Sequence, residues 1–187
     1  MQEIILASKS PRRAELLKKH GIFFDVFISD ADELKTYENP SLLPQLNAEL
    51  KCNAAAQIHP DKTVIGADTV ILFENTILGK PADEEDAVRM LKILSGKKHQ
   101  VITGCAVICI SKNFHYTFSV TSEVIFKKLT EKQIRDYMSK VNVLDKAGSY
   151  AIQEHGDEII ESYSGSLENI IGMPVDELSE VLNMIPA

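Results

Sequence analysis

The hydrophobic positions at the start of the chain predict a strand, a turn and a helix in quick succession. Residues 3–6 are short, apolar and rich in β-branched side chains, as expected of a buried strand. After a polar turn, Leu16, Leu17 and His20 recur at helical spacing, and Gly21 stands where a helix would end. The polar turn therefore lies between a strand end and a helix N-terminus.

Further along, apolar runs and periodic stripes predict that strands and helices are interspersed. Residues 63–73 form the strongest strand pattern, and residues 99–111 and 114–126 predict a long hairpin. Further elements are predicted as follows: a strand at 23–28, helices at 46–58, between Asp83 and Gly96, from Thr130 to 140 and at 175–184, loops at 29–33, 37–44 and 162–166, and a short strand within 144–153. This mixture predicts an α/β fold with a mixed sheet.

Composition and charge narrow the class of protein. With 187 residues, 44% hydrophobic and 25% charged, the chain suits one globular domain, which we expect to span residues 1–187 in two lobes. No apolar run is long enough to cross a membrane, and no signal peptide is recognisable at the start. A net charge of −7 argues against a nucleic-acid-binding surface. An anionic substrate remains compatible if the positive charges gather in one place.

The three cysteines indicate a compartment. Cys52, Cys105 and Cys109 form no C-x-x-C pair and lie in apolar segments. We therefore expect buried thiols and a cytoplasmic location, where thiols stay reduced.

The turn after the first strand carries the first candidate chemistry. Ser8 and Ser10 supply two hydroxyls, and Ser10 suits the N-cap of the helix that starts at Pro11. Arg12 and Arg13 follow in the first turn, where the helix dipole disfavours cations unless an anion offsets them. This pattern predicts a phosphate site, and its alternative is an ordinary capped helix with two solvated arginines.

Carboxylates and lysines supply the second candidate set. Asp68 falls inside the apolar run 63–73, where a carboxylate is costly unless it is paired, hydrogen-bonded or bound to a metal. The acidic residues near Glu33 are either a solvated loop or the edge of a divalent-metal site. Lys51 lies in a predicted helix, Lys80 follows a strand end, and Lys146 precedes a small-residue turn. For each lysine a solvated surface position is the plain alternative.

The ordered set of short segments resembles the Maf family of nucleoside triphosphate pyrophosphatases. The matching segments are residues 7–13 with 15–17, Gly66-Ala67-Asp68-Thr69-Val70, Gly79-Lys80-Pro81, Leu94-Ser95-Gly96 with His99 and Val101, Asp145-Lys146-Ala147-Gly148, residues 150–153, and Gly172-Met173-Pro174. They span nearly the whole chain in the expected order. Within the family, Arg12, Thr69 and Gln153 look like the branch that acts on dTTP and UTP.

The resemblance implies a fold and an activity. The fold would be a bent mixed sheet flanked by helices, related to the Ham1-type pyrophosphatases, with the active site in a cleft between two lobes. The activity would be cleavage of dTTP and UTP, or of a modified pyrimidine nucleotide, to the monophosphate and diphosphate. The family also implies a divalent cation, Mg²⁺ or Mn²⁺, and a homodimer.

Roles can then be assigned to the matching residues. We expect the phosphates to be bound by Ser8, Ser10, Arg12, Arg13, Lys51, Lys80 and Lys146. Glu33 and Asp68 would hold the metal, and Asp68 would also accept a proton from the attacking water. Arg12, Thr69 and Gln153 would select the base, because a glutamine amide matches the edge of uracil and thymine. Alternatively, Gln153 only ends a strand and bonds backbone.

A second class of function is a non-catalytic nucleotide-binding regulator of cell division. Such a module would need the arginines but not a buried aspartate beside them, so the sequence favours catalysis. Metal-dependent release of pyrophosphate from UTP separates the two.

Overall fold

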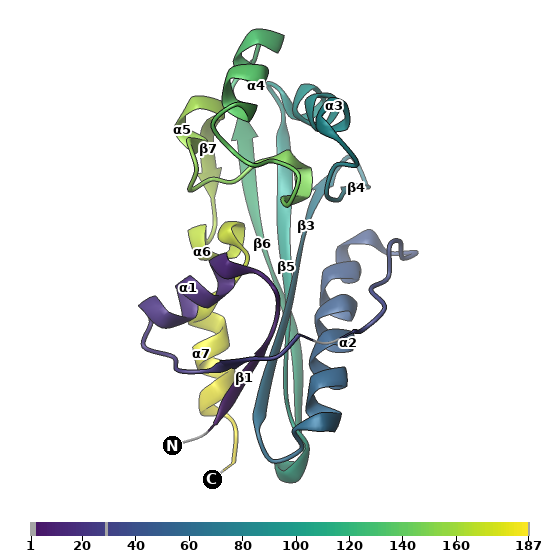
Figure 1. The fold of residues 1–187 in the computed structure, drawn as a ribbon, viewed down its shortest axis with the longest axis vertical. Coiled ribbons are helices and arrows are strands. Elements are labelled where there is room, and N and C mark those ends of the chain that lie inside the picture. The colour runs from purple at the N-terminus through teal and green to yellow at the C-terminus, as the bar shows by residue number, and fades with distance from the viewer. Residues whose placement is uncertain (1–2, 29, 187) are drawn as a thin grey trace. The chain divides into compact units, whose positions relative to one another are not determined.

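The chain folds into two compact units (Figure 1). The computed structural model describes residues 3–28 and 30–186. The first unit takes the described residues of 1–69, 103–120 and 172–187, and the second takes 70–102 and 121–171. Three long strands contribute residues to both units: β3 (Thr63–Phe73), β5 (Lys98–Cys109) and β6 (Phe114–Phe126).

A mixed sheet of seven strands runs through the structure, as the sequence predicts. The strand order is β2-β1-β3-β5-β6-β7, and β4 pairs with β3. The remaining strands are β1 (Ile4–Ala7), β2 (Asp25–Val26), β4 (Thr76–Leu78) and β7 (Ile160–Ser164). β1 runs parallel to β2 and β3, whereas β4 and β7 run antiparallel to their partners β3 and β6.

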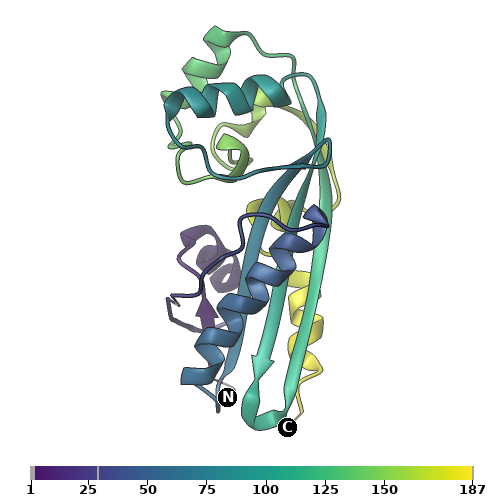
Figure 2. The same cartoon turned by 90° about the vertical axis from the view of Figure 1, so that its right-hand side faces the viewer.

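The first unit places helices on both faces of its strands. α2 (Leu43–Ile58) covers one face, while α1 (Pro11–Lys19) and α7 (Val175–Asn183) cover the other (Figures 1 and 2). α2 sits directly on the sheet because two glycines face it: a Cβ on Gly66 would overlap the Ala48 carbonyl, and one on Gly104 would overlap the Gln45 backbone. None of the helices in the described part of the chain combines the length and apolarity needed to span a bilayer.

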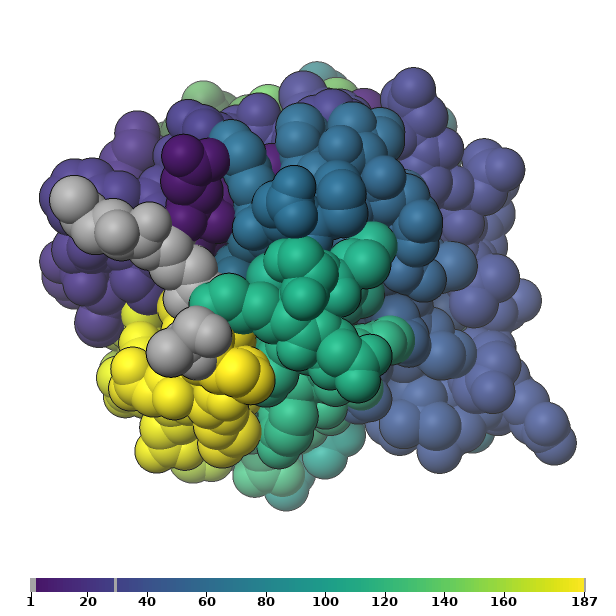
Figure 3. Space-filling model, turned by 90° about the horizontal axis from the view of Figure 1, so that it is seen from below, coloured from purple at the N-terminus to yellow at the C-terminus, as the bar shows by residue number. Residues whose placement is uncertain are grey.

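The turn between β5 and β6 closes this unit at one end. Asn113 adopts the left-handed conformation (φ 48°), which lets the chain reverse after a short 3₁₀ turn at Ile110–Lys112. The Ser111 N–H donates to the Pro60 carbonyl at 2.9 Å, and Lys112 Nζ donates to the Pro186 carbonyl at 2.6 Å. Figure 3 shows the green tip of the hairpin lying between the blue start of β3 and the yellow C-terminal segment.

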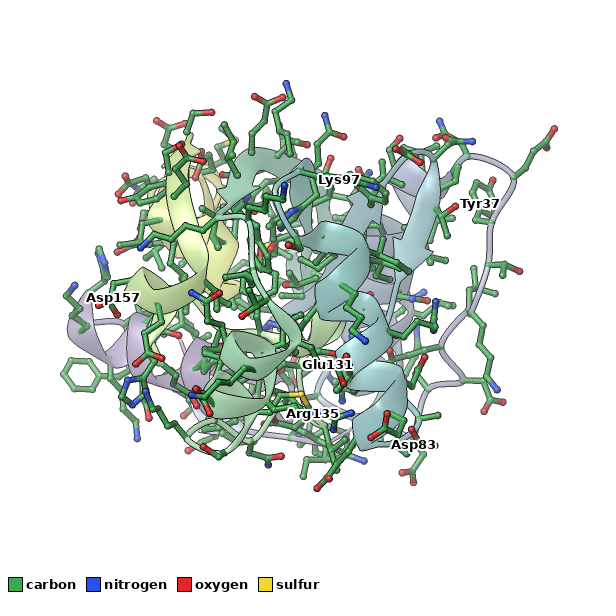
Figure 4. All side chains as sticks on the ribbon, turned by 90° about the horizontal axis from the view of Figure 1, so that it is seen from above. Tyr37, Asp83, Lys97, Glu131, Arg135 and Asp157 are labelled. Carbon is green, nitrogen blue, oxygen red and sulfur yellow. The ribbon has the colours of Figure 1, made fainter. Side chains whose placement is uncertain are left out.

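The second unit has its own apolar core, packed between its strands and the helices α3 (Glu84–Leu94) and α4 (Glu131–Met138). Both helix starts follow the prediction: the Asp83 side chain accepts from the Asp86 N–H, and Thr130 forms a complete capping box. Surface ion pairs link the two helices, among them Arg135 with Glu85 at 3.1 Å; Arg135 also pairs with Glu131 (Figure 4). The short helices α5 (Gly156–Ile159) and α6 (Leu167–Ile171) complete the unit.

Some predicted elements are wrong or shifted. The strand predicted at 23–28 shrinks to the two residues of β2, and α2 begins at Leu43, three residues before the predicted 46. The loop predicted at 37–44 therefore includes the first turn of α2 and a 3₁₀ turn at Pro40–Leu42. The loop predicted at 29–33 lies outside helices and strands as expected, except that Ser29 is outside the described residues.

The two largest errors have a common cause, which is pairing with distant residues. Residues 162–166 were predicted as a loop, but 160–164 form β7, whose side chains after Ile160 are exposed and polar enough to mimic a loop. Conversely, no strand forms within 144–153. There the Ala151 N–H donates to the Tyr137 hydroxyl at 3.0 Å, so a side chain takes the place of a neighbouring strand.

Candidate functional site

The candidate site of the first unit gathers at the carboxyl end of β1. Ala7 pairs with Gly66 in the parallel ladder, and β1 ends there. Asp68 and Thr69 follow further along β3, and as successive strand residues they point to opposite faces. The region beyond the carboxyl end of a parallel strand is where open α/β sheets place ligands. Residues from both faces of β3 can therefore meet the turn that follows β1.

Arg13 is anchored on one of these faces by three hydrogen bonds. Its Nε donates to the Gly172 carbonyl at 2.9 Å, Nη1 to Ser8 Oγ at 3.0 Å and Nη2 to Thr69 Oγ1 at 3.1 Å. A guanidinium has five N–H groups, so one on each terminal nitrogen stays available for a ligand. Burial lowers the pKa of Arg13, and the nearby carboxylate of Asp68 opposes that shift. The guanidinium therefore stays charged and keeps one donor on each terminal nitrogen.

The serines of the turn also support the prediction of a phosphate site. Ser8 is buried, and its hydroxyl oxygen accepts from both Arg13 and the Ser10 N–H, the latter at 3.2 Å. With its oxygen engaged twice, the Ser8 proton is left to donate toward an acceptor. Ser10 occupies the N-cap as predicted, but its side chain makes no capping bond, and Arg12 lies half-buried in the first turn of α1.

Asp68 lies on the α2 face and is held by two side chains of that helix. Lys51 Nζ donates to Asp68 Oδ1 at 3.0 Å, and Asn47 Nδ2 donates to Oδ2 at 3.3 Å. Only 16% of the Asp68 side chain and 11% of the Lys51 side chain are exposed, so the pair is largely removed from water. A buried charge needs such a partner, and losing one member would leave the other uncompensated.

Asn47 is a site residue that the sequence reasoning missed. Its amide also exchanges two hydrogen bonds with the Leu34 backbone: the Leu34 N–H donates to Oδ1 at 2.8 Å, and Nδ2 donates to the Leu34 carbonyl at 3.0 Å. This clamp holds the segment carrying Glu33 against α2, where Glu33 Oε1 lies 3.6 Å from Lys51 Nζ. The available signal was a polar residue one helical turn before Lys51 on the inner side of α2.

Glu33 and Asp68 together fit a divalent cation. Their carboxylates converge on the same ammonium group, so their oxygens already point toward one centre of positive charge. Carboxylate oxygens are the ligands that Mg²⁺ and Mn²⁺ prefer, and Mg²⁺ is commonly held by one or two of them with substrate phosphates and water.

The second unit holds the other predicted residues. Lys146 is buried, and its Nζ donates to the Asn142 carbonyl at 2.6 Å and to Asp145 Oδ1 at 2.9 Å, with Glu154 Oε1 at 3.3 Å. All three ammonium protons thus have oxygen neighbours, and a phosphate would have to replace one of them. Lys80 is exposed.

Gln153 lies exposed in a turn and not at the end of a strand. The segment before it is fixed by buried aromatic residues. Tyr137 bonds the Ala151 backbone through its hydroxyl, and the Tyr150 hydroxyl lies 2.7 Å from His99 Nε2. Neither long-range contact could be read from sequence spacing.

The structure thus divides the predicted residues between the units. Ser8, Ser10, Arg12, Arg13, Glu33, Lys51, Asp68 and Thr69 belong to the first, and Lys80, Lys146 and Gln153 to the second. Arg13, Ser8 and Thr69 are in direct contact, as are Lys51, Asp68 and Glu33. The cleft between lobes stays a prediction.

Comparison with known proteins gives consistent matches. A family model described as "Maf-like protein" matches residues 3–185. A "dTTP/UTP pyrophosphatase" of Akkermansia muciniphila is 50% identical over 181 residues, which is 96% of this chain and 95% of that protein. A protein of the same name from Bacillus cereus (strain G9842) is 42% identical over 179 residues, covering 95% and 93% of the two chains.

A solved structure shares the fold. It is the nucleoside-triphosphatase / dITP/XTP pyrophosphatase of Mycobacterium abscessus, which matches with a TM-score of 0.50 over 97% of this chain and 94% of that one. The two chains are 14% identical, so this likeness concerns the fold alone.

Proposed function

The chain belongs to the Maf-like protein family, and from that premise we propose that it hydrolyses dTTP and UTP to the nucleoside monophosphate and diphosphate. The observation that carries this proposal is the 50% identity to a dTTP/UTP pyrophosphatase over 96% of the chain. The structure supports it by placing a charged arginine fork and a paired carboxylate around the end of one strand.

The chemistry requires neutralising and positioning a polyanion more than covalent participation of the protein. Arg13 donates its two remaining N–H groups to phosphate oxygens, and Ser8 adds its hydroxyl proton. Ser10 and Arg12 extend the same contact from the N-terminus of α1, where backbone N–H groups favour anions. We also assign Lys51, Lys80 and Lys146 to the phosphates as point charges.

Asp68 is the proposed general base. It accepts a proton from the water that attacks phosphorus while the anhydride bond between the α and β phosphates breaks and pyrophosphate leaves. Lys51 Nζ, 3.0 Å from Asp68 Oδ1, pairs with the carboxylate and holds that oxygen in place. Asn47 fixes the orientation of the carboxylate through its other oxygen.

Glu33 and Asp68 are the proposed ligands of a divalent cation, Mg²⁺ or Mn²⁺. When bound, such a cation neutralises phosphate charge and raises the acidity of water. Binding requires Lys51 to yield part of its contact with the two carboxylates, and the half-exposed Glu33 side chain leaves room for that change.

We propose that Gln153 selects the base, with Thr69 and Arg12 as further specificity residues. The Gln153 carbonyl can accept from N3–H of uracil or thymine while its NH₂ donates to a neighbouring carbonyl. Cytosine presents the opposite pattern, so it leaves polar groups unpaired unless the amide flips. We expect CTP to be at least ~10²-fold worse than UTP. Rates for UTP, dTTP and CTP on wild type and Gln153→Glu check this, and equal rates for CTP and UTP would exclude the role.

A cytoplasmic location and a homodimer complete the proposal. The location is supported by three buried free thiols, since burial raises the pKa of Cys105 to about 12 and free thiols suit a reducing compartment. The homodimer rests on the family resemblance, and sedimentation velocity tests it.

The decisive experiment measures pyrophosphate release from UTP and dTTP with Mg²⁺, with Mn²⁺ and with a chelator. We expect metal-dependent release of one pyrophosphate per nucleotide. Nucleotide binding without release would instead favour the regulator of cell division, although such a module has no need of Asp68 and Glu33 around Lys51.

A further inference from the structure

One fully buried hydroxyl of the first unit touches the Arg13 network without belonging to any motif named above. Thr103 lies on β5 with no exposed surface, and its Oγ1 is 3.0 Å from Thr69 Oγ1. Thr69 in turn accepts a hydrogen bond from Arg13 Nη2. A single hydroxyl therefore separates Thr103 from the guanidinium.

Strand alternation explains why the two threonines meet. Gly66 of β3 and Gly104 of β5 face α2, because a Cβ on either would overlap the backbone of that helix. Thr69 and Thr103 stand at odd spacings from these glycines and so face the other side, where Arg13 of α1 approaches. β3 and β5 are neighbours in the sheet, so this is a cross-strand threonine pair beneath an arginine.

We propose that Thr103 is a positioning residue that orients Arg13 through Thr69. Whichever hydroxyl donates, the bond between them turns the Thr69 proton away from Arg13 and leaves a lone pair for Nη2. The guanidinium is then held with its two remaining N–H groups toward the substrate. This inference rests on the proposed function of Arg13 in binding phosphate.

Two other hydrogen-bond partners of Arg13 limit how far the loss of the Thr103 hydroxyl can lower kcat. Ser8 and the Gly172 carbonyl still hold Arg13 when Thr103 loses its hydroxyl. Small displacements of a charge-stabilising group act mainly on the transition state, and they can cost up to about 10²-fold in rate. Thr103→Val keeps the shape of the side chain, so we expect kcat to fall about 10-fold, with KM changing less than threefold.

The first test combines this variant with a rescue and a matched control. Thr103→Ser restores the hydroxyl and is expected to recover most of kcat. Thr117→Val removes a different hydroxyl of the same unit, one that accepts from Gln45 Nε2 at 2.9 Å, and is expected to leave kcat unchanged. Melting temperatures of all variants are recorded in parallel. A Thr103→Val enzyme with wild-type kcat, or no recovery in Thr103→Ser, overturns the proposal.

The second test is a double-mutant cycle with Arg13→Ala. If Thr103 acts through Arg13, adding Thr103→Val to Arg13→Ala should lower kcat by less than twofold, although it costs about 10-fold in the wild type. If the losses in kcat of the two single variants multiply in the double variant, Thr103 has only a structural role.

A failure of the proposed function can be distinguished from a failure of the role proposed for Thr103. If the wild type releases no pyrophosphate from UTP or dTTP, the proposed function fails on its own. The same cycle, run on the affinity for inorganic pyrophosphate by calorimetry, then decides the role of Thr103: non-additive losses support it, and additive or absent losses overturn it.

Discussion

At the scale of single residues, the site holds one largely buried ion pair, Asp68 with Lys51, and an arginine held by neutral oxygens. Asp68 interrupts the apolar strand β3, where burying a carboxylate is unfavourable. Hydrogen bonds from Lys51 and Asn47 offset the cost of removing it from water. A satisfied carboxylate is the structural alternative to a catalytic one, but the two roles are compatible. The hydrogen bonds that compensate the buried Asp68 carboxylate also fix its orientation, as a general base requires.

Asp68→Asn separates these roles. The change removes charge and basicity but little volume, so we expect the fold to persist while pyrophosphate release from UTP falls about 10²–10⁴-fold. Circular dichroism and turnover at saturating Mg²⁺ measure the two effects. Asp136→Asn, which alters an exposed ion pair with Lys132, serves as control. Activity within a few-fold of wild type would make Asp68 purely structural.

At the scale of elements, the sequence predicts what local pattern controls and misses what distant partners control. The caps at Asp83 and Thr130 and the long strand β3 follow from neighbouring residues, so their prediction is confirmed. The extended segment at Ala151 is no strand because Tyr137 satisfies its backbone. Likewise, the pairing of Thr69 with Thr103 depends on strand order, which periodicity does not reveal.

The same limit applies to the candidate site. Ser8, Arg13, Lys51 and Asp68 could be singled out from residue type and local position, and the structure brings them together in two contact groups. Asn47 offers only the weaker signal of a polar residue one helical turn before Lys51, because its role depends on a contact with the Leu34 backbone in a loop without periodic pattern.

The packing of α2 on the sheet gives a prediction at this scale. A Cβ at Gly104 would overlap the backbone of Pro44 and Gln45, and backbone cannot move aside as a flexible side chain can. We expect Gly104→Ala to lower the free energy of unfolding by about 1–3 kcal/mol or more. Because α2 carries Asn47 and Lys51, activity should fall as well.

Gly79→Ala is the matched control, since nothing lies within 4 Å of its added Cβ. This substitution should change the free energy of unfolding by no more than about 0.5 kcal/mol. Urea unfolding of both variants measures the difference. Equal stability of Gly104→Ala and wild type would mean that α2 is not pressed onto β5 as described.

At the scale of the whole molecule, a chain of net charge −7 presents cations to an anionic substrate only where the fold gathers them. Arg13 and Lys51 of the first unit are each held in place by neighbouring oxygens. In the proposed function, their placement rather than the overall charge suits a nucleotide. Overall charge and buried titratable groups bear instead on how stability depends on pH.

His99 makes the stability of the protein depend on pH. It is buried beside Phe126 and Tyr150, and burial lowers its pKa from 6.5 to about 4. Its Nδ1 has no hydrogen-bond partner among the described residues, so a protonated ring would bury an unpaired donor together with a charge. Between these two pKa values the unfolded chain binds more protons than the folded one, so stability falls as pH falls.

We therefore expect the free energy of unfolding to be constant with respect to His99 above pH 6.5 and to drop by up to about 3 kcal/mol as pH falls from 6.5 to 4. Carboxylates such as Glu131 and Glu158, whose pKa values are lowered by Lys92 and Lys140, lose their contribution only below about 4.5. Urea unfolding at pH 7.0, 5.5 and 4.5 on wild type and His99→Gln isolates the histidine. The variant starts less stable but should lose little further stability between pH 7.0 and 5.5, whereas parallel losses in both proteins would assign the pH dependence to other groups.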